Sequence, residues 1–314
     1  MGLLDWLKPT PPVAAGLLPY IEKSAATIDP LIKQISGYEH SLAPAVEHAL
    51  AYCAEIAQRI PGPFEVSRAA FAGDPMVHAL FGSADEIDTM LATSQCVRDH
   101  LSPLTMATGR CCALLGMRCH EKQGFGVRLD GDIVRTDVAQ TTLYFSDHTL
   151  TEPSPDAASA RTRLRDLLFE GIVKGIAAHV GDVRAEHALL DQEKAFTHAR
   201  LRAGLQPEAH TRRLASLHAQ LSASTDALQP EKLLLTLVEA LAAPEPFLSL
   251  DPIDLAIDRA GVIVNNKSSG DLLHFAQLTG RDLRRWVVVL ALIDRADAHR
   301  ALDRFESARH YIVI

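Results

Sequence analysis

The stretch FGVRLDGDIVRTDV, residues 125–138, decides the fold class of this chain. Apolar residues occupy every second position from Phe125 to Leu129, and a second strand-like run covers Ile133 to Val138. Asp130-Gly131 separates the two runs and is typical of a tight β-hairpin turn, because glycine accepts the positive φ that such turns require. The stretch therefore predicts two antiparallel strands.

Segments on both sides of this hairpin continue the two-residue period. Apolar and other residues alternate from Cys111 to Cys119, and a further strand-like run covers Thr141 to Phe145. Alternation of this kind is typical of a strand with one buried face. We therefore expect three or four strands in a first antiparallel β module, residues 106–152.

A second β module is predicted near the end of the chain, in residues 245–314. Leu273–Leu278 and Trp286–Ile293 form a paired-strand pattern, and the uninterrupted apolar run 286–293 is typical of a strand buried on both faces. A final helix is expected near Ala298–Ala308. The apolar tail Tyr311–Ile314 is expected to add an edge strand or to meet a partner.

The rest of the chain has helical spacing. Residues 13–105 predict a small helical bundle, with a capping-box signature at Ser83 and Glu86. Residues 153–244 predict long amphipathic helices, the first beginning at Ser154-Pro155-Asp156. Its apolar stripe consists of Leu164, Leu168, Ile172, Ile176, Val180 and Val183. The predicted fold class is α+β, mainly helical with two antiparallel β modules.

Composition narrows the function classes. The chain has 314 residues and a mass of 34.1 kDa, which is enough for a large core without disulfides or a structural metal. A formal net charge of −8 weighs against nucleic acid as a partner, because phosphate binding depends on clustered Lys and Arg. The Ala-, Leu- and Arg-rich composition fits a bacterial protein.

The cysteines and the start of the chain are typical of a cytoplasmic protein. Five cysteines, an odd number, include no CxxC pair, and no secretory signal is present, so we expect a reducing cytoplasm. Free cysteines of this kind usually behave as small buried apolar residues. No run approaches the roughly 18 apolar residues that a membrane-spanning helix requires.

Phosphate-loop, dinucleotide, zinc-protease and hydrolase-elbow motifs are absent from the sequence, and we expect no cofactor. The remaining candidates for chemistry lie in the first β module. His120, Glu121, Asp147 and His148 combine imidazoles with carboxylates, which can bind a divalent metal or share a proton. Their spacing is also what turns and polar strand faces use, so an ordinary structural role is the main alternative.

The two ends of the chain are candidate partner-binding segments. Residues 1–12 place four bulky apolar side chains before a proline-rich linker, and such a tag suits a groove on a partner or, less favoured, a membrane surface. The candidate contact residues are Leu3, Leu4, Trp6, Leu7, Tyr311 and Ile312.

The sequence thus favours a non-catalytic cytoplasmic adaptor or assembly protein that binds a protein partner and forms a homo-oligomer. Amphipathic helices in the middle of the chain are expected to supply the contact surface. Two alternatives are a metal-dependent or acid/base enzyme using His120 and His148, and a peripheral membrane protein anchored by its first residues.

Overall fold

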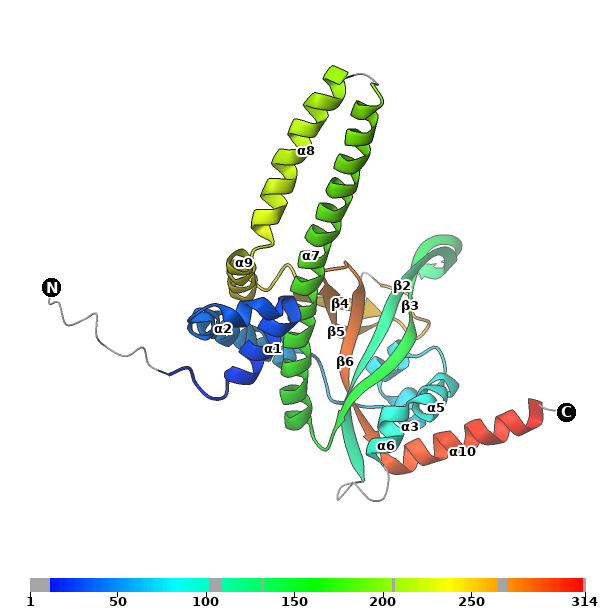
Figure 1. Cartoon of the computed structure of the whole chain (residues 1–314). Coiled ribbons are helices and arrows are strands. Elements are labelled where there is room, and N and C mark those ends of the chain that lie inside the picture. Colours follow the sequence, from blue (N-terminus) through cyan, green and yellow to red (C-terminus); the bar gives the residue numbers. More distant parts are fainter. Residues whose placement is uncertain (1–11, 102–108, 131–132, 205–206, 265–269, 313–314) are drawn as a thin grey trace, which may run out of the picture. The chain divides into compact units, whose positions relative to one another are not determined.

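The computed structural model describes residues 12–101, 109–130, 133–204, 207–264 and 270–312 (Figure 1). The predicted α+β class, mainly helical, is confirmed. The chain divides into two compact units, Met1–Tyr52 with Phe169–Phe247, and Cys53–Leu168 with Leu248–Ile314. The boundary falls inside two helices, α2 (Tyr38–Arg59) and α7 (Ala157–Arg202), so each unit contains part of both.

Helices make up the described part of the first unit. Besides its parts of α2 and α7, they are α1 (Leu18–Ile28), η2 (Pro30–Gln34), α8 (Pro207–Ala227) and α9 (Pro230–Ala242). Two starts follow directly from sequence: Asp29 accepts from the amide of Leu31 at the beginning of η2, and Pro230 opens α9. Proline suits the first turn of a helix because it has no amide proton to leave unpaired.

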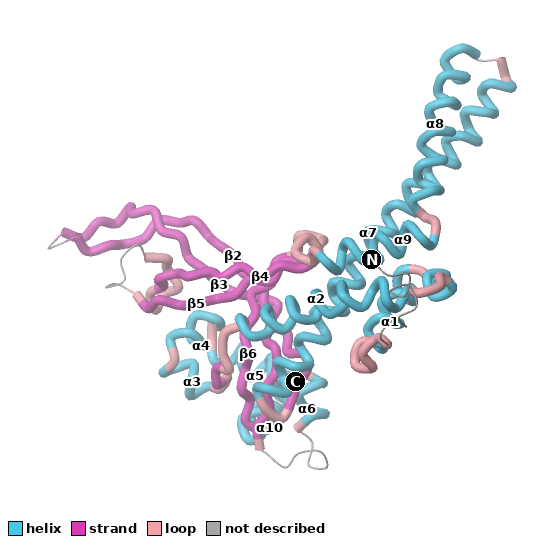
Figure 2. The backbone as a smooth tube through the Cα atoms, turned by 90° about the vertical axis from the view of Figure 1, so that its left-hand side faces the viewer, coloured by secondary structure: helices cyan, strands magenta, loops and turns pink. Residues whose placement is uncertain are grey.

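The distal part of α7 and α8 lie side by side as an antiparallel helical hairpin (Figures 1 and 2). Arg213 of α8 donates to both carboxylate oxygens of Glu193 of α7, at 2.7 and 2.8 Å. Leu214, Leu217 and Leu221, spaced by three and four residues, are buried on one face of α8. This spacing is what an amphipathic helix needs to bury one stripe.

The apolar stripe predicted for the long helix is present and buried. Its buried members are Leu164, Leu168, Ile172, Ile176 and Val180, each at most 4% exposed, and only Val183 is partly exposed. The prediction that this stripe would seek another polypeptide is therefore wrong. Helices of the same chain already cover it, and any free apolar surface on α7 must lie elsewhere.

The second unit combines a sheet with short helices (Figure 2). Its strands are β1 (Phe64–Glu65), β2 (Arg110–Asp130), β3 (Ile133–Ser154), β4 (Leu248–Ile257), β5 (Asp271–Gly280) and β6 (Arg285–Asp294). Its remaining helices are α3 (Arg68–Gly73), α4 (Pro75–Leu80), α5 (Ala84–Thr93), α6 (Gln95–His100) and α10 (Arg295–Ile312). The predicted capping signature is realised at α5, where Ser83 Oγ accepts from the amide of Glu86.

The two predicted β modules combine into one sheet with the strand order β3-β2-β6-β5-β4. Antiparallel pairing of β2 with β6, from Arg110 opposite Asp294 to Met117 opposite Val287, joins them. The short β1 pairs with β6 in parallel. As predicted, β6 is buried on both faces, since Val287 to Ala291 are each at most 2% exposed.

Two expectations about strands need correction. The three or four short strands expected in the first module are two long ones, β2 and β3, which pair from Cys112 opposite Ser154 to Asp130 opposite Ile133. The tail expected to form an edge strand is helical as far as Ile312, because α10 continues through it. A short run of apolar residues fits both the 3.6-residue period of a helix and the two-residue period of a strand, so it does not distinguish between them.

A short segment after β4, Gly261–Val264, joins the two edges of the sheet, and we call it the strap. The amide of Leu143 in β3 donates to the carbonyl of Gly261, and the amide of Ile263 donates to Thr141 of β3, both at 2.8 Å. On its other side, the amide of Val264 donates to Ala256 of β4 at 2.8 Å. The strap therefore covers part of both edge strands. Without such a cover, the backbone of an edge strand is free to pair with a strand of another chain.

One face of the sheet holds the main core of the second unit. Leu115, Met117, Phe145, Phe275 and Val289 belong to it, together with apolar residues of the short helices and of α10. The rings of Phe145 in β3 and Phe275 in β5 lie 5.4 Å apart, although the two strands are not neighbours. The twist of the sheet brings these strands together over the core.

Candidate functional site

The β2–β3 ribbon extends beyond the other strands of its sheet (Figures 1 and 2). Pairing of β2 with β6 ends at Met117, and the strap contacts β3 from Leu143 to Thr141. We call the free end of the ribbon the β arm: Arg118–Val127 of β2, which β6 no longer pairs, and Val134–Gln140 of β3, which the strap does not reach. A two-stranded ribbon is only marginally stable without further packing. Contact of its faces with a partner would therefore stabilise it.

Bulges are confined to one strand of the ribbon. At all three register shifts, two residues of β3 lie opposite one residue of β2. Asp147 and Glu152 adopt positive φ values of 57° and 51° at two of them. Bulges bend a strand and interrupt its hydrogen-bonding edge. β2 is therefore the regular strand of the arm, and its side chains alternate faces without interruption.

One face of the arm is basic and aromatic. It carries Arg118, His120 and Lys122 of β2, which are separated by two residues and so point the same way. The His120 ring stacks on Tyr144 at 5.0 Å, and the Arg118 guanidinium lies 5.4 Å from the centre of the Trp286 ring. Cation–π and stacked pairs of this kind hold long side chains in place at a surface.

The opposite face of the arm carries Glu121 and Gln123 nearer the sheet and uncovered apolar side chains toward the tip. Phe125 is 80% exposed, Val127 62% and Val134 60%. Nearer the sheet, the same face of β2 carries Leu115 and Met117, which are fully buried in the core. Glu121 and Gln123 therefore separate the core from a second apolar area at the tip of the arm, and exposed apolar surface of this kind marks interaction sites.

The structure places the predicted His/carboxylate set on different sides of the ribbon. His120 Nε2 lies 2.8 Å from Ser146 Oγ on the basic face, where Asp147 also pairs with Arg118 at 3.4 Å. Glu121 points to the other face, opposite Leu143. The bulge at Asp147 turns His148 toward the helices, where its ring stacks on Phe81 and its Nε2 lies 2.7 Å from the Leu80 carbonyl.

Metal ligation is consequently not what these four residues are arranged for. Within the described ranges, no cluster of three or more His, Cys, Asp or Glu side chains could hold a metal ion. The two imidazoles instead take part in ring stacking and local hydrogen bonds. Alternation along a strand, together with a bulge that the sequence does not reveal, separates them.

The thiols behave as the sequence predicts. All five cysteines are free, and Cys53, Cys111 and Cys112 are buried. Burial raises the pKa of Cys53 and of Cys111 to about 12, and that of Cys119 to about 11. A thiol with such a pKa is protonated at neutral pH, and only the thiolate is a good nucleophile or metal ligand.

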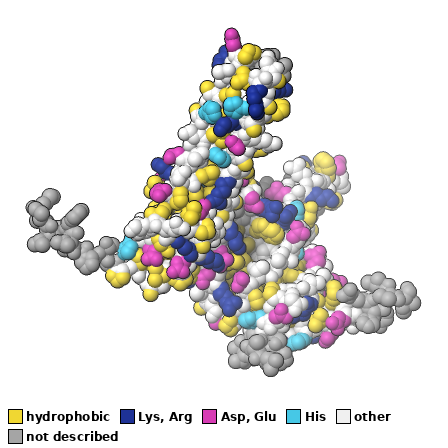
Figure 3. Space-filling model, in the orientation of Figure 1, with side chains coloured by type: hydrophobic (Ala, Val, Ile, Leu, Met, Phe, Trp, Pro, Cys, Tyr) yellow, Lys and Arg dark blue, Asp and Glu magenta, His cyan; other side chains and the backbone are white. Residues whose placement is uncertain are grey.

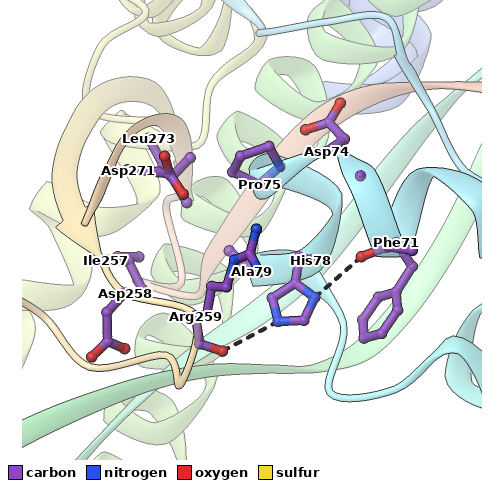
Figure 4. Close-up of a pocket in the computed structure, with 12 residues that line it drawn as sticks. Phe71, Asp74, Pro75, His78, Ala79, Ile257, Asp258, Arg259, Asp271 and Leu273 are labelled. Atoms are coloured by element: carbon purple, nitrogen blue, oxygen red, sulfur yellow. Dashed lines mark hydrogen bonds between the residues drawn. The ribbon is translucent and has the colours of Figure 1, made fainter. Parts of the chain in front are cut away.

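Two adjoining hollows of about 180 and 370 Å³ flank His78 of α4, where β4 leads into the strap. In Figure 4 the His78 ring faces two carbonyls, with Nδ1 3.1 Å from Phe71 O and Nε2 3.2 Å from Arg259 O. Asp74 accepts from the amide of Met76, and Asp258 from that of Val262. These polar groups thus hold backbone in place, and their bonds are internal.

The outer face of the helical hairpin is the second uncovered surface. Leu189 is 66% exposed and Phe196, seven residues later, is 59% exposed. Small exposed residues flank them at steps of three, four and seven residues, namely Gly181, Ala185, Ala188, Ala195 and Ala199. On the space-filling surface, apolar side chains alternate with charged and histidine side chains along this hairpin (Figure 3).

Of the partner-binding residues predicted at the chain ends, Leu3, Leu4, Trp6 and Leu7 lie outside the described residues. Tyr311 and Ile312 belong to the last turn of α10, and their side chains also lie outside what the structure describes. None of the helices in the described ranges is long and apolar enough to cross a membrane.

Comparison with protein-family models, with curated proteins and with solved structures finds no match for this chain. The features of the described residues that bear on function are the two uncovered surfaces, the β arm and the outer face of the helical hairpin. Sequence reasoning missed both of them, although the basic positions 118, 120 and 122 and the apolar positions 125 and 127 were readable as the two sides of one strand.

Proposed function

We propose that this protein is a non-catalytic adaptor or assembly protein that associates with a second copy of itself through the outer face of the α7–α8 hairpin. The observation that carries the proposal is the exposure of Leu189 and Phe196 on one side of α7. Residues seven apart lie on the same face of a helix, so the two side chains project from the same side of α7.

The small residues beside them favour a helical partner. Gly181, Ala185, Ala188, Ala195 and Ala199 leave room for another helix to approach closely along the same line. Spacings of three and four residues match the seam at which two helices pack with a small crossing angle. A second copy presents the same seam, and a two-fold axis makes such a face complementary to itself.

Contacts within the hairpin keep this face rigid before any partner arrives. Glu193 and Arg213 join the two helices from one side, and His187 Nδ1 lies 2.7 Å from Ser224 Oγ. Both contacts leave Leu189 and Phe196 on the outside. A surface that is already ordered loses less conformational entropy on binding.

The test is the mass of the protein in solution. We expect a dimer at micromolar concentration by light scattering after gel filtration, and a monomer for the double variant Leu189→Glu/Phe196→Glu. Each central apolar residue of an interface contributes about 2 kcal/mol when it is a hot spot. The matched control is Ser216→Glu/Ser222→Glu, which adds the same charge at exposed positions of α8. A wild-type monomer, or equal masses for both variants, contradicts the proposal.

A further inference from the structure

β2 has an open hydrogen-bonding edge in the arm. β6 occupies this edge of β2 from Arg110 to Met117, which lies opposite Val287, and β6 itself begins only two residues away, at Arg285. Beyond Met117, no strand in the described part of the chain pairs with the same edge. Main-chain groups of Arg118–Val127 on that side therefore continue the line along which β6 already pairs.

Nothing in the backbone of β2 blocks this edge. The three bulges all lie in β3, and the segment Arg118–Val127 contains no proline. Bulges and prolines are the usual devices that keep an edge strand from accepting another strand. The one protective feature on β2 is charge, since Lys122 and Arg118 both project from the arm.

The two faces of the arm define which strand fits. A strand added beside β2 alternates its own side chains between the same two faces. On one face these side chains meet Arg118, His120 and Lys122, and on the other they meet Phe125 and Val127 at the tip, beyond Glu121 and Gln123. Acidic residues complement the first face, and apolar residues complement the outer part of the second.

A second copy of β2 does not fit this edge. Pairing that matches apolar face with apolar face also sets the basic side chains against those of the other copy, and like charges opposite each other are unfavourable. Single-stranded nucleic acid is also disfavoured, because the arm offers few clustered Lys and Arg side chains for phosphates and carries Glu121 on its other face.

We infer that the outer edge of β2, Arg118–Val127, is a docking site for an extended segment of a partner protein in which acidic residues alternate with apolar ones. Main-chain hydrogen bonds supply the affinity and the two faces of the arm supply the specificity. This inference goes beyond the proposed self-association, because it concerns a different surface and a different kind of partner.

Trp286 is a built-in reporter for this edge. It lies 5.4 Å from Arg118, at the point where β6 leaves β2. The chain has two tryptophans, so the full-length variant Trp6→Phe retains Trp286 as its single indole fluorophore. The probe is a synthetic peptide of about eight residues in which glutamate and valine alternate, a typical strand length.

We expect the Trp286 emission to change and to reach saturation as the glutamate–valine peptide is added. The Lys122→Glu variant should bind this peptide with about tenfold lower affinity. Lys232→Glu, the same change at an exposed position of α9, is the matched control and should leave binding unchanged. A lysine–valine peptide and single-stranded oligothymidylate should not bind. Absence of any response to the glutamate–valine peptide overturns the inference, as does equal binding of either competitor.

Backbone pairing is tested with two further peptides, N-methylated at all glutamates or at all valines. One edge of an extended peptide carries the amides of alternate residues, so one of the two peptides should lose binding and the other should retain it. Retention by both peptides leaves only attraction between charges and overturns the inference. Self-association is read from mass, so the two proposals fail independently.

Discussion

His120 stacks on Tyr144 across the β2–β3 ladder, with ring centroids 5.0 Å apart and ring planes inclined by 18°. The same imidazole lies 2.8 Å from the hydroxyl of Ser146, so three side chains of one face are locked together. This arrangement uses His120 to order the basic face of the arm. It also keeps the ring away from His148, which packs against Phe81 and Leu80 on the other side.

Truncation should destabilise the fold strongly at one phenylalanine of the sheet and hardly at all at another. Phe145 is 8% exposed in the core, whereas Phe125 is 80% exposed on the arm. We expect Phe145→Ala to lower the free energy of unfolding by about 3–5 kcal/mol, since it leaves a cavity. Phe125→Ala should change it by less than about 0.5 kcal/mol. Urea unfolding measures both, and a large loss for Phe125→Ala contradicts an uncovered arm face.

Asp88 should hold α10 to the rest of its unit. Its carboxylate accepts from Arg304 of α10 at 2.8 Å and also from Arg68 of α3, and its side chain is 11% exposed. Asp88→Ala leaves two guanidinium groups without their shared acceptor and should cost about 2 kcal/mol. Asp85→Ala is the control, because Asp85 also pairs with Arg68 but is 84% exposed. Equal effects in urea unfolding contradict this role.

Alkaline pH should destabilise the fold through its buried thiols. Burial raises the pKa of Cys53 and Cys111 from 9.0 to about 12, so the folded state keeps protons that the unfolded chain releases. The contribution of each thiol to the free energy of unfolding is fully present below pH 9 and is lost as the pH rises toward 12. Between pH 8 and pH 10 we expect a loss of about 1.4 kcal/mol per thiol. Cys111→Ala should reduce this pH-dependent loss by that amount, and an unchanged loss contradicts it.

Gly62 should tolerate no side chain. Its φ is 106°, and a Cβ atom there lies 2.5 Å from the carbonyl oxygen of Leu290. Both features are unfavourable for L-residues, so Gly62→Ala should lower the free energy of unfolding by more than about 1 kcal/mol. A Cβ atom at Gly171, in α7, meets open space, and Gly171→Ala should be neutral or stabilising by up to about 1 kcal/mol. Thermal unfolding measures both variants, and a lower melting temperature for Gly171→Ala than for Gly62→Ala contradicts the backbone conformation at Gly62.

Much of the fold was predictable from local pattern. The apolar run of β6 indicated a central strand, and Asp130-Gly131 indicated the hairpin, because both signals depend on residues close in sequence. Pairing of β2 with β6 was not predictable, since it joins segments more than 150 residues apart and no sequence signal specifies which strands become neighbours. The bulges were equally hidden, because Asp147 and Glu152 adopt positive φ without being glycine.

The two surfaces proposed for binding are not those that the sequence indicated. Periodicity identified the apolar stripe of α7, yet it could not show that helices of the same chain cover Leu164 to Val180. Leu189 and Phe196 remain outside because α8 packs on another face of α7. Exposure depends on tertiary packing. In a sequence, an apolar stripe that is buried within the chain has the same spacing as one that stays exposed.

The central claim is tested most directly by the sedimentation-equilibrium mass of the full-length protein across micromolar concentrations. Self-association through the hairpin predicts a mass twice that of the 34.1 kDa chain, falling to the monomer mass when Leu189 and Phe196 are both replaced by glutamate. A monomer at every concentration contradicts the account.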